Sequence, residues 1–177
     1  MSLQLRTSLK TTLVFLALSL VFVLSLIIAS AQAHPSSPAQ TPNLFVANQT
    51  GNTIREFAPS GEDLGYFVTT GLNGPTGLAF DKRGNLYVTN FGGNTIREFS
   101  PTGQDLGNFA TTGLNTPAGL AFDKHGDLYV SNRGDGTIRE FSPTGEDLGY
   151  FATTGMITPV GLAFSPKPQD ENENGDG

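Results

Sequence analysis

The stretch NLYVTNFGGNTIREFSPTGQDLGNFATTGLNTPAGLAFDKHG, residues 85–126, decides the fold of this chain. Near-copies of it begin at Asn43, Asn85 and Asp127, so the starts lie 42 residues apart with no insertion or deletion between them. A fixed internal period of about 20–50 residues is typical of solenoids, propellers and repeat arrays. The sequence therefore predicts three structural repeats, 43–84, 85–126 and 127–168.

Each repeat contains four short apolar segments separated by Gly- and Pro-containing turns. In the middle repeat the segments are 85–90, 95–100, 105–112 and 119–122. Their lengths and their content of Val, Ile, Phe, Tyr and Thr favour strands. None has a 3.6-residue apolar period long enough for a helix, and the turn residues would interrupt one. We therefore expect an all-β fold.

The strands of one repeat carry apolar side chains on both faces. Leu86 and Val88 point to one side of their strand and Tyr87 to the other, because side chains alternate along a strand. Ile96 and Phe99 also lie on opposite faces of theirs. A four-stranded antiparallel sheet that is buried on both faces is the blade of a β-propeller.

Residues 75–103 carry a motif that resembles a known repeat. It reads P-x-G-L-A-F-D-x-x-G-N-L-Y-V-x-N, then G-x-N-x-I-x-x-F, then a Gly at position 103. This resembles the NHL repeat and the related propellers of the SMP-30/gluconolactonase/LRE-like and streptogramin-lyase groups. The resemblance extends over all three repeats, 43–164, and implies propeller blades, often six to a ring.

Two repeated positions depart from the family pattern. Where the family usually has Asp and Arg, this chain has Asn48, Asn90 and Asn132 and Thr53, Thr95 and Thr137, respectively. A salt bridge between blades at these positions is therefore missing. Arg97 and Glu98, with their counterparts in the other repeats, are expected to supply a substitute pairing between blades.

The resemblance makes the segment GLAF the innermost strand of a blade, so the first blade lacks an inner strand of its own. The spare segment 161–164 is predicted to complete it. Three blades are fewer than the four to eight that propellers typically have. We therefore expect a homodimer that forms a six-bladed ring, in which each chain lends its last inner strand to the other. The alternative is an open or closed arc of three blades.

The first 33 residues are typical of a secretory signal peptide. Arg6 and Lys10 precede a long apolar run, and Ala31-Gln32-Ala33 offers a cleavage site. The alternative is an uncleaved membrane anchor over residues 11–30. Both alternatives place the repeats outside the cytoplasm, as a secreted, periplasmic or membrane-anchored domain.

The remaining regions and the composition limit the range of partners. Residues 34–42 are predicted to be a Pro/Ser-rich linker and residues 169–177 an acidic disordered tail. The chain has no cysteine and a net charge of −6. Two of its ten basic residues lie in the leader, so the part after it has eight bases, sixteen acids and a charge of −8. No nucleic-acid partner is expected, and membrane contact is expected only through an uncleaved leader.

The positions that vary between repeats are the candidates for binding. The loop between the second and third strands reads QTG, FGG and RGD in the three repeats, and the approach to the inner strand varies as well. Loops on a rigid scaffold often carry binding residues. The predicted binding residues are Phe91, Arg133, Asp135, Met156 and Ile157, and the predicted ligand is a protein or a carbohydrate.

Catalytic residues are not predicted. The repeated carboxylates, such as Glu98 and Asp105, are expected to be structural, and His125 is expected to be exposed in a turn. No metal or cofactor is predicted, although a structural calcium ion on the propeller axis is an alternative. We therefore expect an exported, non-catalytic binding or scaffold module. The alternative is an enzyme of the lactonase or streptogramin-lyase type, or a truncated or degenerate copy of one.

Overall fold

The computed structural model describes residues 41–165, which form eleven β-strands. The predicted signal peptide, all but the last two residues of the predicted linker, and the predicted acidic tail lie outside the described residues. Among residues 41–165 there is no helix, so the predicted all-β class is confirmed. Consequently, no membrane-spanning helix is found in the described part of the chain.

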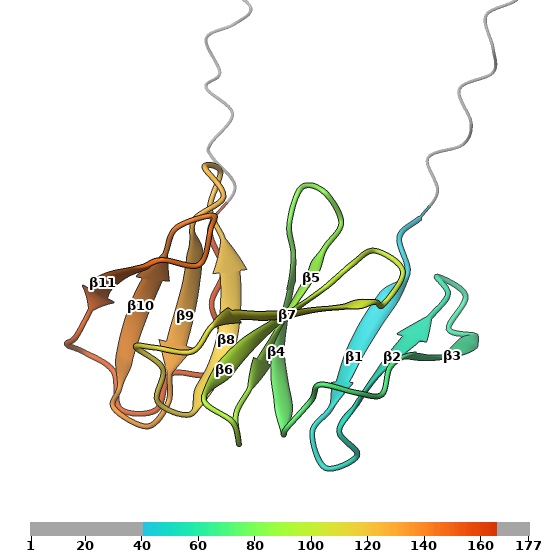
Figure 1. The fold of residues 1–177 in the computed structure, drawn as a ribbon, viewed down its shortest axis with the longest axis horizontal. Helices are drawn as coiled ribbons and strands as arrows, with labels where there is room; N and C mark the ends of the chain where they lie inside the picture. Colours follow the sequence, from blue (N-terminus) through green and yellow to red (C-terminus); the bar gives the residue numbers. More distant parts are fainter. Residues whose placement is uncertain (1–40, 166–177) are drawn as a thin grey trace, which may run out of the picture. The chain divides into compact units, whose positions relative to one another are not determined.

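The strands form three antiparallel sheets, which we call blades one, two and three (Figure 1). Blade one has three strands: β1 (Leu44–Asn48), β2 (Thr53–Phe57) and β3 (Asp63–Val68). Blade two has four strands: β4 (Pro75–Phe80), β5 (Leu86–Asn90), β6 (Thr95–Phe99) and β7 (Asp105–Ala110). Blade three has four strands: β8 (Pro117–Phe122), β9 (Leu128–Asn132), β10 (Thr137–Phe141) and β11 (Asp147–Ala152). Each strand pairs with the next along the chain, as in a propeller blade.

Neighbouring blades pack face to face through apolar clusters. Between blades one and two, the buried residues Ile54 and Val68 contact Leu86, Val88 and Phe99. These five side chains are almost completely excluded from water, and their burial stabilises the contact between the two blades. The predicted burial of Leu86, Val88 and Phe99 is confirmed.

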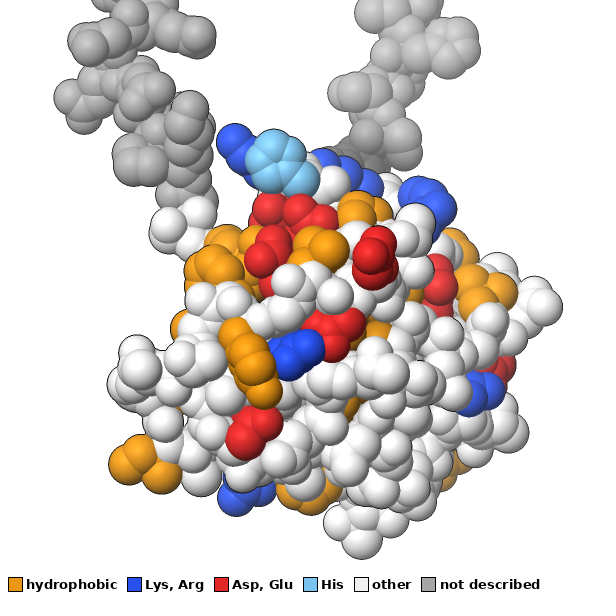
Figure 2. All heavy atoms as spheres, turned by 60° about the vertical axis from the view of Figure 1, so that its left-hand side comes forward, with side chains coloured by type: hydrophobic (Ala, Val, Ile, Leu, Met, Phe, Trp, Pro, Cys, Tyr) orange, Lys and Arg blue, Asp and Glu red, His pale blue; other side chains and the backbone are white. Residues whose placement is uncertain are grey.

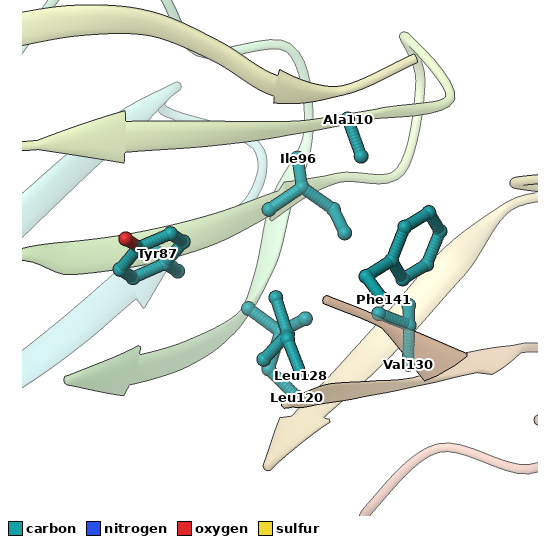
Figure 3. Close-up of a cluster of buried hydrophobic side chains, with 7 residues drawn as sticks. All are labelled: Tyr87, Ile96, Ala110, Leu120, Leu128, Val130 and Phe141. Atoms are coloured by element: carbon teal, nitrogen blue, oxygen red, sulfur yellow. The ribbon is translucent and has the colours of Figure 1, made fainter. Parts of the chain in front are cut away.

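The opposite face of blade two packs on blade three in the same way (Figure 3). Tyr87, Ile96 and Ala110 meet four residues of blade three: Leu120, Leu128, Val130 and Phe141. Ile96 and Phe99 therefore do lie on opposite faces of β6, in two different clusters. Blade two is a sheet with two cores, as the alternating apolar pattern predicted.

A chain of aromatic rings crosses each of these boundaries. Tyr87 stacks edge-on against Phe109 on one side and Phe122 on the other, with ring centroids 4.9 Å apart in both pairs. Phe45 makes the same pair of contacts with Phe67 and Phe80. Edge-to-face aromatic pairs add to the free energy of simple burial.

The inner strands approach each other closely because small residues line them. A Cβ atom at Gly77 would collide with the backbone of Ala118 in the next blade. The buried hydroxyl of Thr89 accepts a hydrogen bond from the Gly77 amide at 2.6 Å and donates one to the Ala118 carbonyl at 2.8 Å. Ser131 does the same with Gly119 and Val160, whereas blade one has Ala47 at this position.

The prediction that residues 161–164 complete blade one as its inner strand is not met within one chain. Residues 161–164 form no strand, and β1 remains the edge of a three-stranded sheet. The segment lies on blade three instead, where the Val160 carbonyl accepts from Ser131 at 3.2 Å and Phe164 stacks on Tyr129 at 5.0 Å. It takes the place of an inner strand of a following blade, and no strand among residues 41–165 pairs with it.

The expected pairing of Arg97 and Glu98 between blades is also wrong. Arg97 forms a two-pronged ion pair with Asp105 in its own blade, at 2.9 and 2.6 Å. The Glu98 carboxylate accepts from the Tyr87 hydroxyl at 2.9 Å, also within blade two. The register shift between Glu98 and Phe99 brings Asp105 within reach of Arg97. The expectation that the repeated carboxylates are structural is confirmed by these contacts.

Candidate binding surfaces

The variable loops gather at one end of the blades, which we call the loop rim. It consists of the loops that follow β1, β3, β5, β7, β9 and β11, namely residues 49–52, 69–74, 91–94, 111–116, 133–136 and 153–158. The other end, which we call the turn rim, consists of tight turns at residues 58–62, 81–85, 100–104, 123–127 and 142–146. The two rims differ in how their backbone is held.

On the loop rim, asparagine side chains fix the segments that connect one blade to the next. The Asn90 amide donates to the Gly71 carbonyl at 3.0 Å and its oxygen accepts from the Asn73 backbone amide at 3.0 Å. Asn132 makes the same two bonds with Gly113 and Asn115. A carboxylate cannot donate, so Asp would lose half of this arrangement. This gives a physical role to the Asn residues that depart from the family pattern.

On this fixed backbone, two of the predicted binding residues come together. The Arg133 guanidinium lies over the Phe91 ring at 5.8 Å from its centroid, a cation–π distance. Arg133 is exposed and Phe91 is half-buried. They occupy equivalent positions in the loops of neighbouring blades, and the remaining repeat has Gln49 at that position.

The other three predicted residues lie on the same rim. Asp135 is exposed and accepts a hydrogen bond from the Thr137 hydroxyl at 2.6 Å. Ile157 is 90% exposed and Met156 is half-buried, and the backbone carbonyls of both face Gly136. All five predicted residues therefore lie at one end of the blades, although a direct side-chain interaction joins only Phe91 and Arg133 among them.

The turn rim carries a cleft that the sequence did not predict. It has a volume of about 360 Å³ and lies where blades two and three meet. Its lining is aromatic and charged: Phe80, Asp81, Lys82, Arg83, Tyr87, Phe122, Asp123, Gly126, Pro143 and Thr144. Figure 2 shows acidic and basic side chains gathered around apolar ones at this end of the described residues. The lining comes from turns about 20–40 residues apart, which no short motif connects.

The carboxylates of the cleft are committed to their own turns. Asp81 accepts from the backbone amides of Arg83 and Asn85, both at 2.8 Å. Although burial alone would raise the pKa of Asp81, these hydrogen bonds and the Arg83 side chain lower it below its usual range. Asp123 is held similarly, and backbone hydrogen bonds lower its pKa despite partial burial. Both carboxylates are therefore charged turn-stabilising groups rather than proton donors at neutral pH.

Two phenols, Tyr87 in the lining of the cleft and Tyr129 in a separate small pocket of blade three, stay protonated at neutral pH. Burial raises the pKa of the Tyr87 hydroxyl, and its hydrogen bond to Glu98 raises it further. Burial and Glu140 raise the pKa of Tyr129 to about 12. His125 is exposed in its turn, as predicted. Within residues 41–165, no three His, Cys, Asp or Glu side chains come together as a metal site would require.

Comparison with known families agrees with the blade geometry. The family model described as NHL repeat matches residues 72–99, which run from the end of the first connecting segment through β4, β5 and β6. This stretch of the chain is similar to an NHL repeat. This confirms the resemblance predicted from the sequence. A search of curated proteins found no match.

Solved structures share the fold at low sequence identity. Virginiamycin B lyase from Staphylococcus aureus is 21% identical over 70% of this chain and 42% of its own, with a TM-score of 0.59. A putative gluconolactonase is 24% identical over 69% and 41%, with a TM-score of 0.55. A chain of the nidogen/laminin complex is 20% identical over 67% and 47%, with a TM-score of 0.60. The chain thus spans less than half the length of each of these propellers.

Proposed function

We propose that this chain is a non-catalytic binding module that acts outside the cytoplasm and binds a protein through its loop rim. The observation that carries the proposal is the pairing of Phe91 and Arg133 across two neighbouring blades. Aromatic residues and Arg are the residue types most enriched where protein interfaces gain their binding energy. The constant polar residues beneath them, such as Asn90 and Asn132, hold the rim rigid.

Two further considerations support this assignment. The constant carboxylates are used within the fold, in ion pairs and turns, whereas the exposed loops of the loop rim differ between the repeats. The propeller of the nidogen/laminin complex belongs to an assembly of proteins, so this fold does serve protein recognition. The lyase and gluconolactonase likenesses are below 25% identity and support the fold alone.

A second candidate ligand is a carbohydrate bound in the cleft of the turn rim. Its volume of about 360 Å³ lies in the range of small-molecule sites, and Phe80, Tyr87 and Phe122 line it. Aromatic rings pack on the apolar faces of sugars, and Arg83 and Lys82 lie beside them to contact hydroxyl or acidic groups. The two ligand classes therefore correspond to two opposite rims.

Two variants separate these candidates. The double variant Phe91→Ser, Arg133→Ser is expected to lose binding to purified secreted proteins of the host, while keeping any binding on an array of defined oligosaccharides. Arg83→Ser, on the turn rim, is expected to lose binding to the oligosaccharides while keeping binding to the secreted proteins. Binding that neither variant changes would contradict both sites, and hydrolysis of a lactone or opening of a streptogramin by the parent chain would contradict a non-catalytic role.

The location outside the cytoplasm rests on the charged start, apolar run and Ala31-Gln32-Ala33 site of the leader. N-terminal sequencing of the exported protein is expected to begin at His34. A product that keeps Met1 and sediments with membranes would instead support an anchor over residues 11–30. A full-length product in the cytosol would contradict the proposed location.

A further inference from the structure

Blade one carries an apolar face that no other blade covers in the described residues. We call it the entry face; it consists of Leu44, Val46 and Phe57. Leu44 is 63% exposed and Val46 is 41% exposed. Their counterparts in blade two, Leu86 and Val88, are completely buried against blade one. The entry face therefore has the composition of a core without a neighbour.

Blade three carries the complementary face, which we call the exit face. It surrounds a small apolar cavity of about 130 Å³ lined by Ala121, Tyr129, Ile138, Phe151, Leu162, Ala163 and Phe164. Phe151 is 60% exposed, Phe164 is 49% exposed and Val160 beside them is 59% exposed. Contiguous exposed apolar side chains of this kind mark an interaction surface.

The chain itself contains two examples of how such faces fit together. At the first boundary Leu86, Val88 and Phe99 pack on blade one, and at the second their counterparts Leu128, Val130 and Phe141 pack on blade two. The entry face has the same residue types in the same strand positions. The exit face repeats the surface that receives them, with Tyr129 and Ile138 in the places of Tyr87 and Ile96.

We infer that two copies of this chain associate head to tail, with the entry face of each on the exit face of the other. The segment from Pro159 to Phe164 already lies where the inner strand of the next blade belongs. In the pair it becomes the fourth strand of the partner's blade one and covers the exposed edge of β1. Two chains then contribute six blades, a number at which propellers close, and two equivalent interfaces complete the ring.

The inference fixes a register. Within the chain, β4 pairs with β5 so that Phe80 lies opposite Leu86 and Leu78 opposite Val88. Blade three repeats this register between β8 and β9. The same register, applied to the segment one repeat further along the chain, places Phe164 opposite the partner's Leu44 and Leu162 opposite the partner's Val46. A shift of one residue would turn every side chain to the wrong face.

The first test is the mass of the exported protein, produced from the full-length sequence, by light scattering along a dilution series. Twice the chain mass is expected. The double variant Leu44→Asp, Val46→Asp is expected to weaken association about a hundredfold, because it places charges in an apolar interface. The control Leu106→Asp changes a 50% exposed residue on the outer strand β7, away from both faces, and is expected to keep the parent mass.

The second test addresses the register and does not depend on disrupting the fold. The chain has no cysteine, so the pair Val46→Cys, Leu162→Cys is the sole source of disulfides. Directly opposite residues have Cα atoms at a separation that a disulfide accepts. A covalent dimer is expected under mild oxidation, and the off-register pair Val46→Cys, Ala163→Cys is expected to give far less.

Three results would overturn the inference. A single-chain mass for the parent protein at every concentration would mean that something other than a second copy covers the faces. A disulfide within one chain would mean that the three blades close on themselves. Equal cross-linking of the two cysteine pairs would mean that the copies meet without a defined register.

Discussion

Leu86 and Leu44 occupy the same position in two nearly identical repeats, yet Leu86 is completely buried and Leu44 is 63% exposed. The same difference separates Val88 from Val46. Local sequence makes both segments strands, β5 and β1, with the same pairing to the strand that follows. What differs is the neighbouring blade. The comparison shows that in a repeat protein the stability contributed by a residue depends on the adjacent repeat as much as on its own.

The largest expected effect is on stability and follows from replacing Leu86, the buried residue of this comparison. Leu86→Ala should lower the free energy of unfolding by about 3 kcal/mol, because it leaves a cavity between blades one and two. Leu44→Ala, measured at a concentration low enough for single chains, should change it by less than about 0.5 kcal/mol. Urea denaturation of the two variants measures both values. Equal losses would mean that blade one is covered within a single chain.

The next effect concerns the asparagines of the loop rim. Asn90→Asp removes the donor to the Gly71 carbonyl and places a carboxylate at a site that is 4% exposed. We expect a loss of about 2 kcal/mol at neutral pH. Burial raises the folded-state pKa of such a carboxylate, so the variant should regain stability as the pH falls towards 4 and lose it as the pH rises.

Asn48→Asp is the matched control for this prediction. Asn48 is exposed at the end of β1 and holds no preceding connecting segment in the described residues. Its replacement should leave stability nearly unchanged at both pH values. If Asn48→Asp and Asn90→Asp lowered stability equally, the hydrogen bonds to Gly71 and Asn73 would not be the cause.

A smaller effect is expected at the ion pairs between the last two strands of each blade. The hydrogen bond from Arg97 lowers the pKa of Asp105, and that from Arg55 lowers the pKa of Asp63. A lowered folded-state pKa contributes stability above the unfolded value, near 4, that is lost as the pH falls through the folded value. Asp105→Asn should therefore cost about 1 kcal/mol at neutral pH and flatten the acid limb of the stability curve.

Asp63→Asn provides the comparison, because the Arg55–Asp63 pair is more exposed. The side chain of Asp63 is 45% exposed and that of Asp105 is 26% exposed. In blade two the pair also lies against Gly71 of the preceding connecting segment, a contact that blade one lacks. Solvent screens the more exposed Arg55–Asp63 pair, so this pair should contribute less to the pH dependence of stability. A flatter acid limb for Asp63→Asn than for Asp105→Asn would contradict this ranking.

The sequence predicted those parts of the fold that depend on one repeat. Alternation along 85–90 placed Leu86 and Tyr87 in different cores, and the turn residues bounded the strands to within about two positions. The pairing of Arg97 was predicted wrongly, because a register shift beside Glu98 brings Asp105 to it. A one-residue irregularity of this kind has no signal in the apolar pattern.

Features that require several repeats at once were beyond sequence reasoning. Phe91 and Arg133 were predicted separately as rim residues, but their stacking depends on the spacing of two blades. The cleft of the turn rim combines side chains from Phe80 to Thr144. Residues 161–164 have the composition of an inner strand, but a strand needs a partner, and the described residues of one chain offer none.

The smallest expected effect comes from a substitution that makes blade one resemble the other two blades. At the position of Thr89 and Ser131, whose hydroxyls bridge two inner strands, blade one has Ala47. In Ala47→Ser the new hydroxyl should reach the Thr76 carbonyl, as Thr89 reaches that of Ala118. One hydrogen bond of this kind contributes about 0.5–1 kcal/mol.

The same hydroxyl could also accept a bond from the amide of Gly161, but this residue reaches it only from the partner copy in the proposed ring. Ala47→Ser should therefore raise the melting temperature slightly in single chains and, in addition, tighten association about threefold. Ala47→Val, which adds bulk without a hydroxyl, is the control for packing. A gain in melting temperature with no change in association would place blade one beside blade two as described but leave its inner edge without the partner's strand. A gain in both melting temperature and association would show that the entry face binds the partner as the blades bind each other within one chain. The same hydroxyl hydrogen bond would then join the inner strands at the internal boundaries and at the boundary between copies.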